Sequence, residues 1–165
     1  MIHLELRDGV DVLSVASDDL GNAGTIRWGQ AGGAMKRGKR QQVAVLAVST
    51  RKPGQILLVT SRTSKSWSLA KGNIDPGLEP VEAARKEAFE EAGIRGRMAS
   101  EPVGSYVHRK TVGGKYRVKV FKMHVRKQLS TWPEKKERKR RWVPVKLALK
   151  LIANPSLKQL IKTQF

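Results

Sequence analysis

The sequence predicts a mixed α/β sandwich with one main domain. Two apolar runs of strand length, residues 43–48 and 56–60, flank a turn at Lys52-Pro53-Gly54. Continuous apolar runs are typical of strands that are covered on both faces. Residues 80–92 then change to helical spacing. Strands around one strong helix, with further helical segments at the end of the chain, predict a sheet with helices packed on it.

The helix expected over residues 80–92 has recognisable ends. Pro80 suits the first helical position and Glu82 the third position of a capping box, although Glu79 is a mediocre cap. Gly93 is a natural stop. The apolar stripe that would face the sheet consists of Val81, Ala84, Ala88 and Ala92.

The other elements have weaker patterns. Residues 2–16 alternate as a β-hairpin around Asp8-Gly9, and residues 17–39 predict a loop with one short strand near 25–28. Beyond the helix we expect strands at 103–107, 116–125 and 142–145, a hairpin turn at 112–114, and helices at 146–152 and 156–162.

Charge is the unusual feature of the composition. In 165 residues, 33 Lys and Arg stand against 14 Asp and Glu, a formal net charge of +19. Such a field attracts polyanions, whether nucleic acid, an anionic membrane or a phosphorylated small molecule. The absence of cysteine excludes disulfides, zinc–thiolate sites and a cysteine nucleophile. With neither a secretory signal pattern nor an apolar run of about 20 residues, we expect a cytoplasmic protein.

Three glutamates carry the chemical signal. Glu87, Glu90 and Glu91 are spaced i, i+3, i+4, so they share one face of the predicted helix. Like charges this close repel one another, and a hard divalent cation reverses that repulsion because it prefers carboxylate oxygens. The loop from Lys71 to Gly77 precedes the helix and can bring main-chain atoms to the same point. An isolated E-x-x-E-E is usually a solvated face, but this one lies between Gly72 and Gly93-Ile94.

Residues 72–94, GNIDPGLEPVEAARKEAFEEAGI, resemble the Nudix box G-x5-E-x7-R-E-U-x-E-E-x-G-U, where U is aliphatic, in its full register. Two positions depart from it: Leu78 replaces the first glutamate, and Lys86 replaces the arginine. The approach to the box through Arg62 and Trp67 is similar to that in diphosphoinositol polyphosphate phosphohydrolases and their bacterial relatives. The segments 132–134 and 137–142 are similar to the basic segment of the same subgroup. The resemblance covers residues 40–165, and we expect residues 1–39 to be a hairpin and loop extension.

The resemblance implies a Nudix-type α/β/α sandwich with a mixed sheet, and Mg²⁺-dependent hydrolysis of a phosphoanhydride, with Mn²⁺ as another possible metal. The implied metal ligands are Glu87, Glu90, Glu91 and the main-chain carbonyl of Gly72. Glu91 or Glu87 would prepare the water. The implied phosphate contacts are Arg62, Lys71, Arg138 and Arg140.

Two functions remain open at the level of sequence. The first is a hydrolase that acts on a crowded polyphosphate, such as a diphosphoinositol polyphosphate or a dinucleoside polyphosphate. The second is a Nudix-fold module that binds RNA or a polyphosphate without turnover, which Leu78, Lys86 and the high charge permit. The basic surface favours a substrate with many phosphates over a plain nucleoside triphosphate or a sugar nucleotide. Nucleic acid is a possible partner that is not favoured, and we expect no membrane partner. We expect Trp67 and Trp142 to be core or loop anchors.

Overall fold

A computed structural model of the chain describes residues 2–7, 10–15, 40–110 and 114–165. Two compact units, residues 1–37 and 38–165, are described separately. In the first unit, β1 (Ile2–Arg7) pairs antiparallel with β2 (Val10–Val15), from Ile2 opposite Val15 to Arg7 opposite Val10. The expected turn at Asp8-Gly9 and the strand near 25–28 lie outside the described residues.

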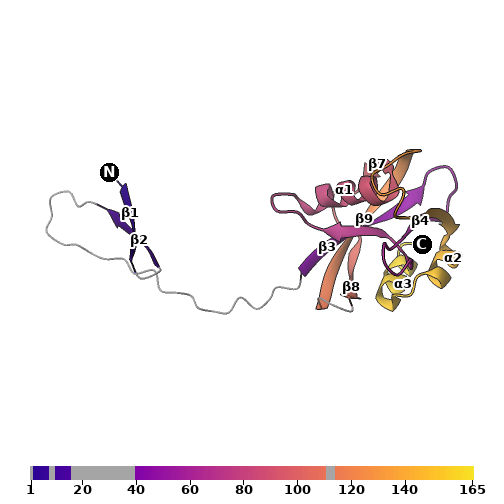
Figure 1. Cartoon of the computed structure of the whole chain (residues 1–165). Coiled ribbons are helices and arrows are strands. Elements are labelled where there is room, and N and C mark those ends of the chain that lie inside the picture. The colour runs from indigo at the N-terminus through magenta and orange to yellow at the C-terminus, as the bar shows by residue number, and fades with distance from the viewer. Residues whose placement is uncertain (1, 8–9, 16–39, 111–113) are drawn as a thin grey trace. The chain divides into compact units, whose positions relative to one another are not determined.

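The second unit is a mixed eight-stranded sheet with helices on both faces (Figure 1). Five strands form its main path in the order β10-β4-β3-β9-β7, while β5 pairs with β4, β6 with β3 and β8 with β9. The pairing of β3 with β9 is parallel and the others are antiparallel. In chain order the elements are β3 (Arg40–Ser49), β4 (Gln55–Thr60), β5 (Trp67–Ser68), β6 (Ala70–Asn73), α1 (Pro80–Ala92), β7 (Ile94–Met98), β8 (Gly104–Lys110), β9 (Gly114–Gln128), β10 (Arg140–Pro144), α2 (Val145–Leu151) and α3 (Pro155–Lys162).

Strand β3 explains the continuous apolar run, because successive side chains enter two different cores. Val43, Val45 and Ala47 pack on the α1-side core, which includes the buried alanines of α1. The side chains between them pack on the α2/α3-side core, which includes Leu157 and Ile161 of α3. Figure 1 shows α1 on one face of the sheet and α2 with α3 on the other. The predicted sandwich is confirmed.

Helix α1 begins and ends where the sequence predicts. Pro80 occupies the first turn, and the Glu79 side chain makes no capping hydrogen bond. Gly93 adopts the left-handed conformation at φ 60°, and its N–H donates to the carbonyls of Ala88 and Phe89. A residue with a Cβ would also meet Cγ of Trp132 at 2.7 Å. Glycine is therefore required there both by backbone conformation and by close packing.

Three strands, β5, β6 and β7, were not predicted. β7 follows α1 directly, with Ile94 and Met98 buried and charged residues between them, so its apolar signal is weak. β6 replaces the first part of the expected loop before the helix and pairs with β3, with Gly72 opposite Val43. This pairing is a long-range contact that local composition does not reveal. Among the helices that the structure describes, none has the length and apolarity needed to span a membrane.

Candidate active site

The three glutamates of the predicted metal cluster lie along one side of α1 but differ in burial. Glu91 is 5% exposed, whereas Glu87 and Glu90 are half-buried. A buried carboxylate needs partners. Glu91 accepts a hydrogen bond from the backbone N–H of Lys71 at 2.9 Å and forms an ion pair with Arg138. It is thereby held between β6 and the segment that precedes β10.

Gly72 lies directly against the Glu87 carboxylate. A Cβ built on Gly72 would overlap the carboxylate carbon and both of its oxygens. Because glycine has no Cβ, β6 and α1 approach so closely that the main chain of Gly72 lies directly beside the Glu87 carboxylate. The structure brings these two predicted ligands together.

Residues 132–140 cover the C-terminal end of α1, where helix carbonyls have no partner within the helix. The backbone N–H of Glu134 donates to the Glu90 carbonyl at 3.0 Å, and Nε1 of Trp132 donates to the Glu91 carbonyl at 3.2 Å. An Nη of Arg140 donates to the Ala92 carbonyl at 2.6 Å. This covering segment and the acidic helix therefore form one hydrogen-bonded unit.

Arg140, which was expected to contact a phosphate, lies at the C-terminal end of α1 in the structure. Its guanidinium stacks on Trp132, 3.7 Å from the ring centroid, and its second Nη donates to the Leu129 carbonyl at 2.5 Å. Partial burial lowers the pKa of Arg140. Its donors are engaged by main-chain carbonyls, so the structure gives it the role of a cap for α1.

Glu134 is a fourth acidic residue at the cluster, and the sequence analysis did not single it out. Its carboxylate forms ion pairs with Arg62, which lies just after β4, and with Arg138. Arg138 is only 12% exposed in its side chain, and it also donates to the Thr60 carbonyl at 2.9 Å. Arg62 pairs further with Glu137 at 2.8 Å. The only sequence signal for Glu134 was its position beside the basic run 135–141. That position does not reveal the contact with α1, which arises only in the folded chain.

The pKa values show where negative charge is least compensated. Burial raises the pKa of Glu87 to about 7, with further contributions from Glu91, Glu90 and Glu134. Burial also raises the pKa of Glu91, against the opposing effects of the Lys71 N–H and Arg138. Burial alone would raise the pKa of Glu134, but hydrogen bonds from Arg62 and Arg138 lower it overall. Glu87 thus carries the charge that most needs a cation.

Comparison with known proteins agrees with this geometry. The model of the NUDIX domain matches residues 40–164. The chain belongs to the Nudix family.

Several relatives support the membership. Nudix hydrolase 13, mitochondrial, of Arabidopsis thaliana is 33% identical over 106 residues, 59% of this chain and 52% of the plant protein. Diphosphoinositol polyphosphate phosphohydrolase 3-beta of Bos taurus is 30% identical over 118 residues, 70% of each chain. The chain spans about half the length of Nudix hydrolases 13 and 12 of Arabidopsis thaliana. The similarity to diphosphoinositol polyphosphate phosphohydrolases expected from the sequence is confirmed.

Solved structures share the fold. A Nudix hydrolase of Nitrosomonas europaea superimposes with a TM-score of 0.61 at 19% identity, over 76% of this chain and 87% of that one. A C. elegans Ap4A hydrolase has a TM-score of 0.61 at 17% identity, over 75% of this chain and 93% of that one. At these identities the similarity concerns the Nudix fold alone.

The two departures from the Nudix box have different structural settings. Leu78, at the position of the first glutamate, packs against the α1-side core. Lys86, at the position of the arginine, forms an ion pair with Asp75 in the loop before α1 and lies 3.9 Å from Glu90. The hydrogen bond that Lys86 donates to the Asp75 carboxylate is the main cause of the raised pKa of Lys86. Lys86 thus links the loop to the helix, whereas Leu78 adds no carboxylate to the cluster.

The donor set fits a hard divalent cation. Mg²⁺ prefers carboxylate and carbonyl oxygens, and the Nudix helix presents carboxylates beside the main chain of Gly72. A cation would also stabilise the ionised form of Glu87, whose pKa is raised by burial and then by the neighbouring carboxylates. Within the described residues no group of three or more His, Cys, Asp or Glu side chains is placed to hold a metal ion. The carboxylates of Glu91 and Glu134 are paired with Arg138.

Proposed function

We propose that this Nudix domain hydrolyses a phosphoanhydride bond in a highly phosphorylated small molecule, with Mg²⁺ or Mn²⁺ held by Glu87, Glu90, Glu91 and the Gly72 carbonyl. The observation that carries the proposal is the placement of Glu87. It is half-buried, lies against Gly72 and has a pKa of about 7. A bound divalent cation would polarise a phosphoryl oxygen and neutralise developing charge.

The chain's own residues divide the remaining tasks. Glu91 already accepts from Lys71 and pairs with Arg138, so Glu87 is the better candidate to take a proton from the attacking water. Arg138 and Arg62, which lie next to the cluster through Glu134, are the candidate phosphate contacts. Lys71, whose backbone N–H fixes Glu91, remains a further candidate.

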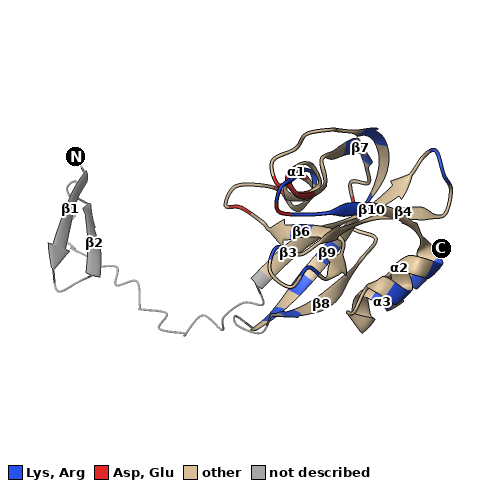
Figure 2. Cartoon of the chain, turned by 45° about the vertical axis from the view of Figure 1, so that its right-hand side comes forward, with Lys and Arg blue, Asp and Glu red and all other residues tan. Residues whose placement is uncertain are grey.

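A basic pocket beside the cluster supports a polyphosphate substrate. Its volume is about 570 Å³ and it shares Arg138 with the acidic cluster. Five of its eight lining residues are Lys or Arg and one is acidic; the lining consists of Thr60, Lys65, Trp67, Lys135, Lys136, Glu137, Arg138 and Lys139. Each phosphate added to a ligand there would gain charge-assisted contacts. Figure 2 shows acidic residues gathered on and before α1, with Lys and Arg spread over strands and helices elsewhere.

The experiment is phosphate release from diphosphoinositol polyphosphates, dinucleoside polyphosphates and nucleoside triphosphates, with and without Mg²⁺ or Mn²⁺. Wild type is compared with Glu87→Gln and Glu91→Gln. Glu82→Gln is the matched control, because it removes the same charge from an exposed position in the first turn of the same helix. We expect metal-dependent turnover that is lost in the first two variants and kept in the control.

The alternative is a Nudix-fold module that binds a polyphosphate or RNA without turnover. The pairing of Glu91 and Glu134 with Arg138 favours it, because these carboxylates already have a cationic partner. Absence of turnover on every compound, in a protein that unfolds cooperatively and binds a polyphosphate, would select this alternative and reject the hydrolase.

A further inference from the structure

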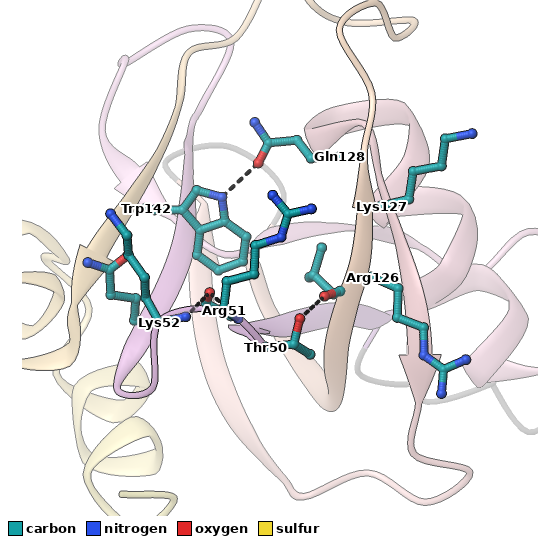
Figure 3. A pocket seen from close by; sticks show the side chains of 10 residues that line it. Thr50, Arg51, Lys52, Arg126, Lys127, Gln128 and Trp142 are labelled. Atoms are coloured by element: carbon teal, nitrogen blue, oxygen red, sulfur yellow. Dashed lines mark hydrogen bonds between the residues drawn. The ribbon is translucent and has the colours of Figure 1, made fainter.

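A second basic pocket, of about 400 Å³, lies at the turn between β3 and β4 (Figure 3). Four of its ten lining residues are Lys or Arg and none is acidic. The lining consists of Ser49, Thr50, Arg51, Lys52, Gln55, Val125, Arg126, Lys127, Gln128 and Trp142. It therefore combines positive charge with an aromatic ring and two side-chain amides.

This turn pocket is separate from the candidate active site. β4 runs from Gln55, which lines the turn pocket, to Thr60, whose carbonyl accepts from Arg138. Five residues of strand at about 3.3 Å each place the two ends roughly 17 Å apart. A ligand in the turn pocket would therefore not reach the glutamates of α1 unless it were long.

Hydrogen bonds fix the turn in place. The Ser49 hydroxyl oxygen accepts from the backbone N–H groups of Arg51 at 3.2 Å and Lys52 at 2.9 Å. The Thr50 hydroxyl donates to the Val125 carbonyl at 2.8 Å and so ties the turn to β9. The pocket is thereby held open by residues from β3, β9 and the turn between β3 and β4, before any ligand binds.

Trp142 reaches across the ends of β4 and β3 from β10. Its indole N–H donates to Oε1 of Gln128 on β9 at 2.7 Å, which fixes the orientation of the ring. Part of the ring packs against the α1-side core, as expected of an anchor, and the rest lines the pocket. Figure 3 shows the Arg51 side chain extending alongside this ring.

The cations of the turn pocket have no acidic partner among the residues that the structure describes. Arg51, Lys52, Arg126 and Lys127 form no ion pair with any residue that the structure describes, whereas the cations at the acidic cluster, Arg62, Lys86 and Arg138, are all paired. Like charges around one pocket repel each other, and an anion reverses the sign of that interaction. An aromatic face beside cations is the arrangement that holds a base and its phosphate together.

We propose that the turn pocket binds a nucleotide, with its phosphate against Arg51 and Lys52 and its base against Trp142. The pocket is larger than a bare phosphate needs, and its ring and amides would be unused by one. The nucleotide could be free or could be one unit of an RNA strand, since both present the same base and phosphate.

The indole N–H signals of the full-length protein in ¹H–¹⁵N NMR test the proposal. The chain has four tryptophans, at positions 28, 67, 132 and 142, so the signals are few, and Trp142→Phe assigns the relevant one. AMP and a hexanucleotide of adenylate are titrated separately. We expect the Trp142 signal to shift in a saturable manner.

The double variant Arg51→Gln/Lys52→Gln should lower the nucleotide affinity measured in that titration roughly ten-fold, because it removes charge-assisted phosphate contacts. Arg97→Gln/Lys146→Gln is the control, because it removes one Arg and one Lys from exposed positions outside the pocket. If Arg51→Gln/Lys52→Gln lowers the affinity for both AMP and the hexanucleotide, a free nucleotide is a sufficient ligand. If it lowers only the affinity for the hexanucleotide, the ligand is an RNA strand. The proposal is overturned if both double variants lower the nucleotide affinity equally, or if the Trp142 signal does not shift. Both double variants should keep metal-dependent hydrolysis, because the turn pocket is separate from the acidic cluster.

Discussion

Protonation of Glu87 should make the stability of the Nudix domain depend on pH. Its pKa in the folded protein is raised to about 7, mainly by burial, against roughly 4.3 for a glutamate in an unfolded chain. Between these values the folded state holds the proton more tightly. The free energy of unfolding should therefore fall as pH rises from about 4.5 to about 7. Below about pH 4.5 Glu87 is protonated in the folded state, so this loss of stability is absent.

The size of the effect follows from the shift. A pKa difference of this size corresponds to about 4 kcal/mol for a fully buried group. Glu87 is only half-buried, so solvent screening reduces the expected cost to about 1–2 kcal/mol. Glu87→Gln is neutral at every pH, so the variant should be more stable than wild type by that amount at pH 8 and no more stable at pH 4.5.

Urea unfolding at pH 4.5, 6 and 8, with and without Mg²⁺, measures this difference. At pH 8 the metal should stabilise wild type more than Glu87→Gln, because only the wild type offers that carboxylate to the cation. Glu82→Gln, at an exposed position of the same helix, should follow wild type at each pH. A constant stability difference between wild type and Glu87→Gln across the pH range would refute the argument.

Three further substitutions test the packing around the cluster. Gly72→Ala should lower Mg²⁺ affinity at least ten-fold, measured by calorimetry, because a Cβ would displace the Glu87 carboxylate. Arg138→Gln should cost about 3–5 kcal/mol in urea unfolding, because it leaves Glu91 buried without its cation; a cost near zero would show that this pair is not needed. Gly93→Ala should lower the unfolding free energy by about 1–3 kcal/mol, since φ is 60° and the space is filled; an unchanged urea midpoint would contradict this.

Local pattern was sufficient for the elements whose side chains repeat with a clear period. The run at 43–48 indicated a strand covered on both faces, and β3 does contact two cores. The spacing of Glu87, Glu90 and Glu91 likewise placed them on one side of α1. These features depend on a single element, so the sequence of that element is enough to predict them.

The features that the sequence did not reveal depend on contacts between distant segments. β6 exists because it pairs with β3, about 30 residues away in the chain. Glu134 reaches the cluster because its backbone N–H caps the Glu90 carbonyl. Arg140 was expected at a phosphate but binds the Ala92 carbonyl. In a run as basic as 135–141, composition alone does not distinguish a structural arginine from one that faces a ligand.

The segment 132–140 has two roles, capping a helix and lining a pocket, and this limits how far it can be exchanged as a unit. It caps the carbonyls of α1 and also carries Arg138, which lines the pocket beside the acidic cluster. A loop graft intended to change ligand preference would therefore also loosen the end of the helix that bears the carboxylates. In such a scaffold, divergence toward new ligands is expected to proceed through single changes in Lys135, Lys136 or Lys139, which leave the capping bonds intact, rather than through replacement of the whole loop.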